Sequence, residues 1–387
     1  AYLKKLLPLK SKILLVTETP PGTPNGFGVT LQCLFQETDH EVLFTDAAFK
    51  EHGENFRYTL AQVPFHPSKK FFIPFKFGKI PEWRGSYSKK WLFNNSNENH
   101  SKVYAFVYSA ECLRYAHWIS TQKNIPILIH LADHSDSFEQ PGISEILMAC
   151  SKLICITEDM KSKYEVMVGR KDIKVLHNGA ENKCFHIAKS SPPPFNDKNP
   201  FVLCFLGGLF SHLHGDCVED FFDAVVQIRK KRPWVEFHLY GQRQPENFLD
   251  DSLNEKGITH HGVVMPLEKK FEIMAKAHCF VIPSSFNPNN HQHYRYSFPT
   301  KLPELIASDK PILSYGPINT ATNRLLKSHN FGIRIHNRSV DDLVLKILEI
   351  IDHSSLNNQD ASVYNSQTKH FFSATTMREK FANILKH

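Results

Sequence analysis

The sequence lacks three features that would restrict its class: a C-x-x-C pair, an Asp-x-Asp triplet, and an apolar run of the roughly 18 residues that a spanning helix needs. Its eight cysteines are scattered, and most stand in apolar runs such as Lys152–Ile156. Such cysteines are typical of reduced core thiols. The sequence as given shows no signal peptide, so we expect a cytoplasmic protein without disulfides.

The net charge of the chain is also small. The 46 Lys and Arg residues exceed the 39 Asp and Glu residues by a formal +7, so the surface should attract phosphorylated ligands or an acidic membrane weakly. The sequence has no long basic run and no RNA-binding type of aromatic strand, which argues against a nucleic-acid partner. A chain of 387 residues, 41% of them hydrophobic, is long enough for two folded domains.

Strand-like and helix-like segments alternate along the chain in two successive series. The first series begins with the apolar strand Lys12–Thr17, and the second begins with Phe201–Leu206. Between them, the proline-rich segment Ser190–Pro200 is the best candidate for a linker. Such alternation is typical of parallel sheets covered by helices. The sequence therefore predicts an α/β fold with two Rossmann-like domains that face one another across a cleft.

A glycine-containing loop follows the first strand. Gly22, Gly26 and Gly28 do not meet the G-x-G-x-x-G spacing of dinucleotide-binding proteins. Gly26 and Gly28, with Phe27 between them, would still let backbone amides approach a ligand at the start of the next helix.

The predicted strand Pro126–Leu131 ends in several polar side chains. Ligands of open α/β sheets bind at the carboxyl ends of strands, so His130, Asp133, His134 and Asp136 are candidates for chemistry. Each of them could equally be a cap or turn residue, because His and Asp are common in loops.

Lys301 and Glu304 stand three residues apart at the start of a predicted helix. They would share one face of its first turn, where free backbone N–H groups favour anions. A cation for phosphate and a carboxylate for hydroxyls would together suit a nucleotide. The alternative is an ordinary solvated surface pair.

The segment from Pro64 to Asn95 alternates aromatic residues with lysines, and prolines interrupt any regular element. It could bind an anionic membrane surface, which would make the protein peripheral to the inner face of the membrane, or grip an extended or lipid-linked acceptor. Alternatively, its aromatic side chains fold back onto the core.

Three stretches resemble, in order and spacing, the retaining family four of the GT-B fold glycosyltransferases (glycosyl transferases group 1). The first is Ile154–Tyr164 with Val175–Glu181, which resembles the family's turn at the domain junction. The second is Gly262–Ser284, similar to the family's glycine strand, helix, and strand ending in Pro-Ser. The third is Phe298–Ile312, which resembles the nucleotide-binding helix.

The resemblance implies an acceptor domain of residues 1–185, joined by 370–387 in a C-terminal helix that packs back on it, and a donor domain of residues 186–369. It implies a hexosyltransferase-type enzyme that moves a sugar with retention from a nucleotide diphosphate sugar to a glycan, lipid-linked or small-molecule acceptor, as in polysaccharide biosynthesis. In the family's front-face mechanism the leaving diphosphate helps to deprotonate the acceptor hydroxyl, and the protein mainly orients groups and stabilises charge.

The same resemblance implies roles for particular residues. Glu304 would hold the ribose of the donor, and His130, Asp133 and His134 would face the transferred sugar as catalytic residues. The implied donor-binding set is Gly26, Phe27, Gly28, Gly208, His214, Arg295, Lys301, Leu302 and Glu304.

The sequence departs from the family at two places. Family members usually carry another carboxylate eight positions before the ribose-binding one, but that position is Tyr296. They also commonly place an Arg and a Lys in the loop after the donor domain's first strand, where Gly208 and His214 stand. We expect Lys301 to supply the missing phosphate cation, helped by Arg295 or by a protonated His214.

No metal or other cofactor is expected beside the nucleotide sugar, because the pairs His212/His214 and His291/His293 are too weakly patterned for a metal site. The missing loop cations leave two alternatives open. One is a catalytically weak GT-B protein that holds a nucleotide sugar or a partner enzyme. The other is a GT-B epimerase that converts the sugar nucleotide itself.

Overall fold

The structure is a computed structural model that describes residues 12–19, 21–23, 25–36, 38, 40–44, 60–62, 100–187, 194–245, 249, 251–264, 268–297, 299–355 and 370–386. All of the predicted membrane or acceptor segment, Pro64–Asn95, therefore lies outside the described residues, as does Phe298. The chain divides into two compact units, unit 1 with Ala1–Asn178 and Arg378–His387, and unit 2 with Gly179–Met377. Within the described ranges, no helix is long and apolar enough to cross a membrane.

Unit 1 is built on a seven-stranded parallel sheet in the order β3-β2-β1-β4-β5-β6-β7. The strands are β1 (Lys12–Thr17), β2 (His40–Phe44), β3 (Leu60–Gln62), β4 (His100–Val107), β5 (Ile127–Leu131), β6 (Lys152–Cys155) and β7 (Lys174–Val175). The central strands are short apolar runs, as parallel strands that are covered on both faces require. The direction of winding reverses between β1 and β4, so their carboxyl ends form the switch point at which ligands of such sheets bind.

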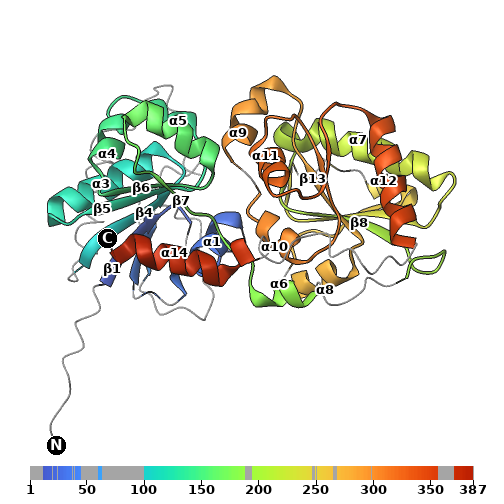
Figure 1. The fold of residues 1–387 in the computed structure, drawn as a ribbon, viewed down its shortest axis with the longest axis horizontal. Coiled ribbons are helices and arrows are strands. Elements are labelled where there is room, and N and C mark those ends of the chain that lie inside the picture. The colour runs from blue at the N-terminus through green and yellow to red at the C-terminus, as the bar shows by residue number, and fades with distance from the viewer. Residues whose placement is uncertain are drawn as a thin grey trace, which may run out of the picture. The chain divides into compact units, whose positions relative to one another are not determined.

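Helices cover both faces of the unit 1 sheet. Figure 1 shows α3 (Ala110–Lys123), α4 (Ile143–Ala149) and α5 (Glu158–Val168) on one face, and α1 (Gly26–Phe35) with the C-terminal α14 (Ala374–Lys386) on the other. Arg378 Nε donates to the Cys33 carbonyl at 2.9 Å, and the ring of Phe381 lies 4.9 Å from that of Phe35. The predicted return of the C-terminal helix to the first unit is confirmed.

Suitable residues begin and end these helices. Ser109 and Thr157 precede α3 and α5, and each side-chain oxygen accepts an N–H of the first turn. Gly169 ends α5 with φ at +67°, a left-handed conformation that glycine adopts without strain. Local sequence therefore sets both ends of α5.

Unit 2 is built on a six-stranded parallel sheet in the order β12-β10-β8-β13-β14-β15, and β9 pairs separately with β11. The strands are β8 (Phe201–Leu206), β9 (Leu209–Phe210), β10 (Val235–Tyr240), β11 (Arg243–Gln244), β12 (Ile258–His260), β13 (Cys279–Pro283), β14 (Ile312–Tyr315) and β15 (Ile333–Ile335). Winding reverses between β8 and β13. The carboxyl ends of these strands, at Leu206 and Pro283, therefore form the switch point of this unit.

The described helices of unit 2 are α6 (Asn182–Ile187), α7 (Ser211–Arg229), α8 (Lys269–Lys276), α9 (His291–Tyr296), α10 (Leu302–Ala307), α11 (Ala321–Ser328) and α12 (Val340–Ser355). All of them except α9 contribute side chains to one of two apolar cores. Helices α7 and α12 contribute Phe221 and Ile347 to one core. Helices α8, α10 and α11 contribute Met274, Leu305 and Leu326 to the other.

The sequence does not reveal strand β9 or the first turn of α7, which occupy Leu209–Gly215. His214 Nδ1 accepts the N–H of Phe210 at 3.3 Å, which satisfies one of the free donors at the helix start. The sequence also does not predict α6 and α9, because six residues are too few to show a helical period.

Candidate functional site

The carboxyl ends of three neighbouring strands of unit 2 meet at one edge of its sheet. Strand β8 runs into Gly207 and Gly208, β13 into Ser284 and Ser285, and β14 into Gly316. A Cβ atom at Gly316 would lie 2.6 Å from Ser284 Cβ, so only glycine lets these two strand ends approach so closely. This edge is where the fold predicts a ligand.

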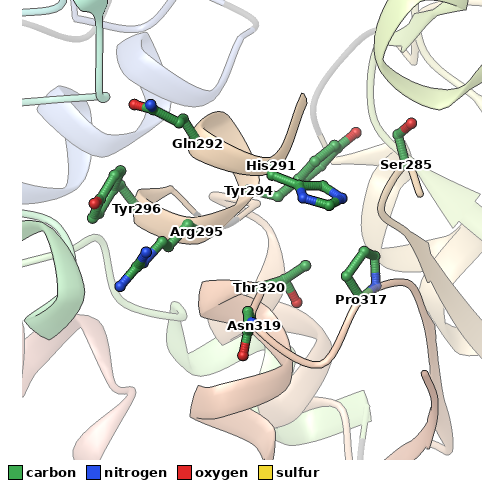
Figure 2. Close-up of a pocket in the computed structure, with 9 residues that line it drawn as sticks. All are labelled: Ser285, His291, Gln292, Tyr294, Arg295, Tyr296, Pro317, Asn319 and Thr320. Atoms are coloured by element: carbon green, nitrogen blue, oxygen red, sulfur yellow. The ribbon is translucent and has the colours of Figure 1, made fainter. Parts of the chain in front are cut away.

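A pocket of about 200 Å³ opens at this edge. It is lined by the end of β13, by α9 and by the segment before α11. In Figure 2, Arg295 and Tyr296 lie together on one side, and His291, Tyr294 and Ser285 lie on the other. The residues that the structure describes around it are Ser285, His291, Gln292, Tyr294, Arg295, Tyr296, Pro317, Asn319 and Thr320, with no carboxylate among them. Such a lining suits an anionic or hydroxyl-rich ligand.

Hydrogen bonds fix the α9 wall of the pocket. The Tyr294 hydroxyl donates to the Leu213 carbonyl in the first turn of α7 at 2.7 Å, and Arg324 of α11 donates to the Arg295 carbonyl at 3.0 Å. The Arg295 side chain is exposed, and its guanidinium lies 5.5 Å from the ring centroid of Tyr296. The backbone of Arg295 is therefore held while its charge is available to a ligand.

His214 lies in the first turn of α7, among the rings of Phe205, Phe210 and Tyr294. Burial lowers the pKa of its imidazole to about 4, and its Nδ1 accepts the Phe210 N–H. The ring is therefore neutral at pH 7. Burial therefore disfavours the expected protonated form of His214, and Gly208 beside it carries no charge, so the roles of both residues in donor binding stay predictions.

Glu304, in the first turn of α10, is buried and pairs with a residue that the sequence analysis missed. Its Oε1 lies 2.6 Å from Nζ of Lys270 on α8, and the two side chains are only 7% and 12% exposed. Burial lowers the pKa of Lys301, and the nearby carboxylate of Glu304 partly offsets this by raising it. Lys301 is therefore a second lysine close to Glu304. Leu302 is fully buried in the core. Glu304 is therefore not part of a solvated surface pair.

His130 is fully buried in β5 of unit 1. Its Nε2 lies 3.0 Å from the Leu176 carbonyl, and its Nδ1 lies 2.8 Å from the Tyr104 hydroxyl. Because a carbonyl only accepts, Nε2 carries the proton and Nδ1 accepts from Tyr104. Burial lowers the pKa of the imidazole to about 3. This is the environment of a core residue, and it speaks against direct contact with a substrate.

Asp133 and His134 follow β5 in a turn. Asp133 Oδ1 accepts the N–H of His134 at 2.8 Å. The buried His134 has Lys163 Nζ 3.2 Å from its Nε2 and the Tyr164 hydroxyl 3.5 Å from its Nδ1, while Asp136 lies 3.7 Å away. The structure thus brings His134 together with Lys163 and Tyr164 of α5.

The predicted glycine loop is tightly packed. Asn25 Oδ1 accepts the N–H of Gly28 at 2.9 Å, and a Cβ atom at Gly28 would lie 2.5 Å from the Thr23 carbonyl oxygen. Gly26 begins α1, and the ring of Phe27 stacks on Tyr108 with 4.6 Å between centroids. The N–H of Gly28 therefore already has a partner within the loop.

Glu18, directly after β1, is a second residue that the sequence analysis missed. Its Oε1 accepts the N–H of Ser109 at 2.9 Å and the Ser109 hydroxyl at 2.7 Å. The carboxylate therefore links the ends of β1 and β4 across the switch point. Burial raises the pKa of this carboxyl to about 7 against the effect of these hydrogen bonds. An acidic residue between an apolar strand and a glycine loop is the signal that could have revealed it.

The cysteines are free and buried, which confirms the prediction of core thiols. Over the part of the chain that the structure describes, no group of three or more His, Cys, Asp or Glu side chains is arranged to hold a metal ion.

Residues 200–353, most of unit 2, match the family model of glycosyl transferases group 1. A comparison with curated protein sequences gives no match. HepE from Anabaena in complex with UDP-glucose is similar in structure at 14% identity and a TM-score of 0.66, with 97% of this chain and 99% of that chain covered.

Two further solved structures are similar over nearly their whole length. The lipopolysaccharide outer core galactosyltransferase WaaB has 17% identity, a TM-score of 0.62, and 97% and 99% coverage. Sucrose-phosphate synthase from Thermosynechococcus elongatus has 13% identity, a TM-score of 0.62, and 97% and 98% coverage. At these identities the likeness shows the fold.

The chain therefore has the GT-B fold of glycosyltransferases, as predicted. Its second unit matches glycosyl transferases group 1, the family that the sequence resembles. Together these findings support an enzyme of the hexosyltransferase type.

Proposed function

We propose that the protein transfers a sugar from a nucleoside diphosphate sugar to an acceptor hydroxyl, with retention at the anomeric carbon. The observation that carries the proposal is the buried carboxylate of Glu304, close to two lysines in the unit that matches group 1. The similar fold of HepE in complex with UDP-glucose supports a nucleotide-sugar donor.

The donor is proposed to bind to unit 2. A carboxylate offers about four lone-pair sites, and Lys270 meets only Oε1 of Glu304, so the group can also accept the ribose hydroxyls. Lys301 and Arg295 would meet the diphosphate. The polar side chains of Ser285, Asn319 and Thr320 in the pocket suit the hydroxyls of the sugar.

In the proposed reaction the bond between the anomeric carbon and the diphosphate oxygen breaks. The acceptor oxygen forms its bond on the same face, and its proton passes to the leaving diphosphate. The protein orients the hydroxyl and stabilises the diphosphate charge through Lys301 and Arg295. We propose that this needs no added metal, so activity should survive EDTA.

Acceptor binding is proposed for unit 1, where Asp133 and His134 lie on the turn after β5. A glycan, a lipid-linked sugar or a small molecule would be the acceptor. The inward orientation of His130 leaves it a supporting role in this unit.

The proposal is tested by incubating the purified chain with uridine, guanosine and adenosine diphosphate sugars, with and without candidate acceptors. We expect acceptor-dependent release of the nucleoside diphosphate, retained anomeric configuration by NMR, and loss of turnover in Glu304→Ala. A donor that changes its own sugar configuration without acceptor would indicate an epimerase. Binding without turnover would indicate a binding protein, and no binding at all would overturn the proposal.

A further inference from the structure

A charged pair joins two helices of the second core of unit 2. Lys270 Nζ on α8 donates to Glu304 Oε1 on α10 at 2.6 Å, across 34 positions of the chain. The ammonium also lies 5.2 Å from the ring centroid of the neighbouring Phe271. The lysine is therefore held on two sides, by a carboxylate and by an aromatic ring.

Stability alone is a weak reason for such a pair. Removing two charges from water costs free energy that their attraction often only offsets, so apolar residues serve a core at least as well. A buried pair is better suited to fixing one orientation of a group than to adding stability. Here the group is the carboxylate proposed to meet the donor.

The charges of this cluster are unbalanced. Lys301 interacts with both members of the pair, favourably with Glu304 and unfavourably with Lys270. Lys183 Nζ lies 5.6 Å from the same Phe271 ring, and Glu181 acts on Cys184 together with Glu304 and Lys270. Three ammonium groups and two carboxylates therefore leave one excess positive charge beside α10. A diphosphate would neutralise that excess, so the cluster suits a bound nucleotide better than an empty site.

We propose that Lys270 is a positioning residue for the nucleoside: it holds Oε1 of Glu304, directs Oε2 to the ribose, and so makes the site select ribose over deoxyribose. This inference rests on the proposed function. A carboxylate fixed in one orientation can accept a hydrogen bond from a ribose hydroxyl without ordering itself first. Without Lys270 the side chain of Glu304 would lose the partner that orients it.

The test is to titrate UDP and 2′-deoxy-UDP into the full chain by calorimetry, or the matching adenosine or guanosine pair if UDP does not bind. The wild type should prefer the ribonucleotide at least about tenfold, because tenfold corresponds to about 1.4 kcal/mol and a hydrogen bond to a charged group is worth roughly 1.5 to 3 kcal/mol. Lys270→Met should reduce that preference to less than about threefold, and Lys270→Arg, which keeps the charge, should largely restore it. Lys276→Met, an exposed lysine of the same helix, should leave it unchanged.

If Lys270 had a purely structural role, its loss would weaken the binding of both nucleotides equally, or would lower the melting temperature without changing the ratio of the two affinities. Either result would overturn the inference. If Lys270→Met does not fold, the preference for UDP over 2′-deoxy-UDP is compared between Lys270→Gln and Lys270→Arg instead. Loss of the ribose preference in Glu304→Gln but not in the Lys270 variants refutes only the role of Lys270. An unchanged preference in Glu304→Gln refutes the proposed donor site itself.

Discussion

Lys270 and Glu304 form a buried ion pair, with 2.6 Å between Nζ and Oε1, across the helices α8 and α10. The pair changes the interpretation of the nucleotide-binding helix. From the sequence, Glu304 is associated only with Lys301 one turn away. In the structure its direct partner comes from a different helix, and Lys301 adds a second positive charge nearby.

Arg295 should contribute to donor binding through its charge. Arg295→Met is expected to lower kcat/KM for the nucleotide sugar about tenfold to hundredfold, since a hydrogen bond between charged groups is worth roughly 1.5 to 3 kcal/mol. The melting temperature should change little, because the side chain is exposed. Steady-state kinetics would check this against Arg232→Met, which breaks a pair with Asp352 on the surface. Equal losses in both variants would contradict a specific role.

The stability of unit 2 should depend on Asp220 of α7. Its carboxylate accepts the Tyr315 hydroxyl at 2.7 Å and two nitrogens of Arg338 at 2.9 and 3.0 Å. Asp220→Asn should destabilise the unit by about 2 kcal/mol. The expected loss is not larger because Arg338 is half exposed, so solvent screens its interaction with Asp220. Asp352→Asn should cost less than about 1 kcal/mol. Urea unfolding would measure the free energy of unfolding of both variants. A smaller loss in Asp220→Asn than in Asp352→Asn would refute the prediction.

Glu18 should make the stability of unit 1 depend on pH. Burial raises its pKa from 4.5 to about 7, so the native state holds this proton more tightly than the unfolded state. The stabilising contribution is therefore complete below pH 4.5 and is lost as the pH rises through 7. Between pH 5 and 8 the free energy of unfolding of the wild type should fall by about 2 to 3 kcal/mol relative to that of Glu18→Gln, because one pKa unit corresponds to about 1.36 kcal/mol.

Urea unfolding at several pH values would measure this difference. Ser109→Ala removes a hydroxyl that lowers the pKa of Glu18, so it should move the titration to higher pH. Parallel pH curves for the wild type and Glu18→Gln would show that the carboxyl does not titrate in this range.

Strands with clear local signals could be predicted from the sequence. The bounds of β1 and β8 agree with the predicted Lys12–Thr17 and Phe201–Leu206, because each is a short apolar run followed by a glycine-containing loop. Position at a strand end did not reveal where a side chain points. His130 is the penultimate residue of β5, and its ring is buried against Tyr104 and Phe106.

Tertiary contacts of the site could not be predicted in the same way. Lys270 stands in α8, within the stretch Gly262–Ser284 that carries the family resemblance, but only the fold brings its ammonium to Glu304. Helix α9 has about one and a half turns and a mostly polar sequence. The Tyr294 hydroxyl donates to the Leu213 carbonyl, and Asn290, just before the helix, donates to the His212 carbonyl, so contacts with α7 hold the wall in place. Such contacts leave no local pattern.

Binding of a nucleoside diphosphate sugar to unit 2 depends, in our proposal, on Glu304. Its most direct test is the calorimetric Kd of the purified chain for the tightest-binding of the uridine, guanosine and adenosine diphosphate sugars, measured also for Glu304→Gln and for the surface variant Glu349→Gln. We predict at least about tenfold weaker binding for Glu304→Gln, from the loss of a charged acceptor, and no change for Glu349→Gln. Equal affinity in all three proteins, or no binding of any of the donors, would contradict the claim.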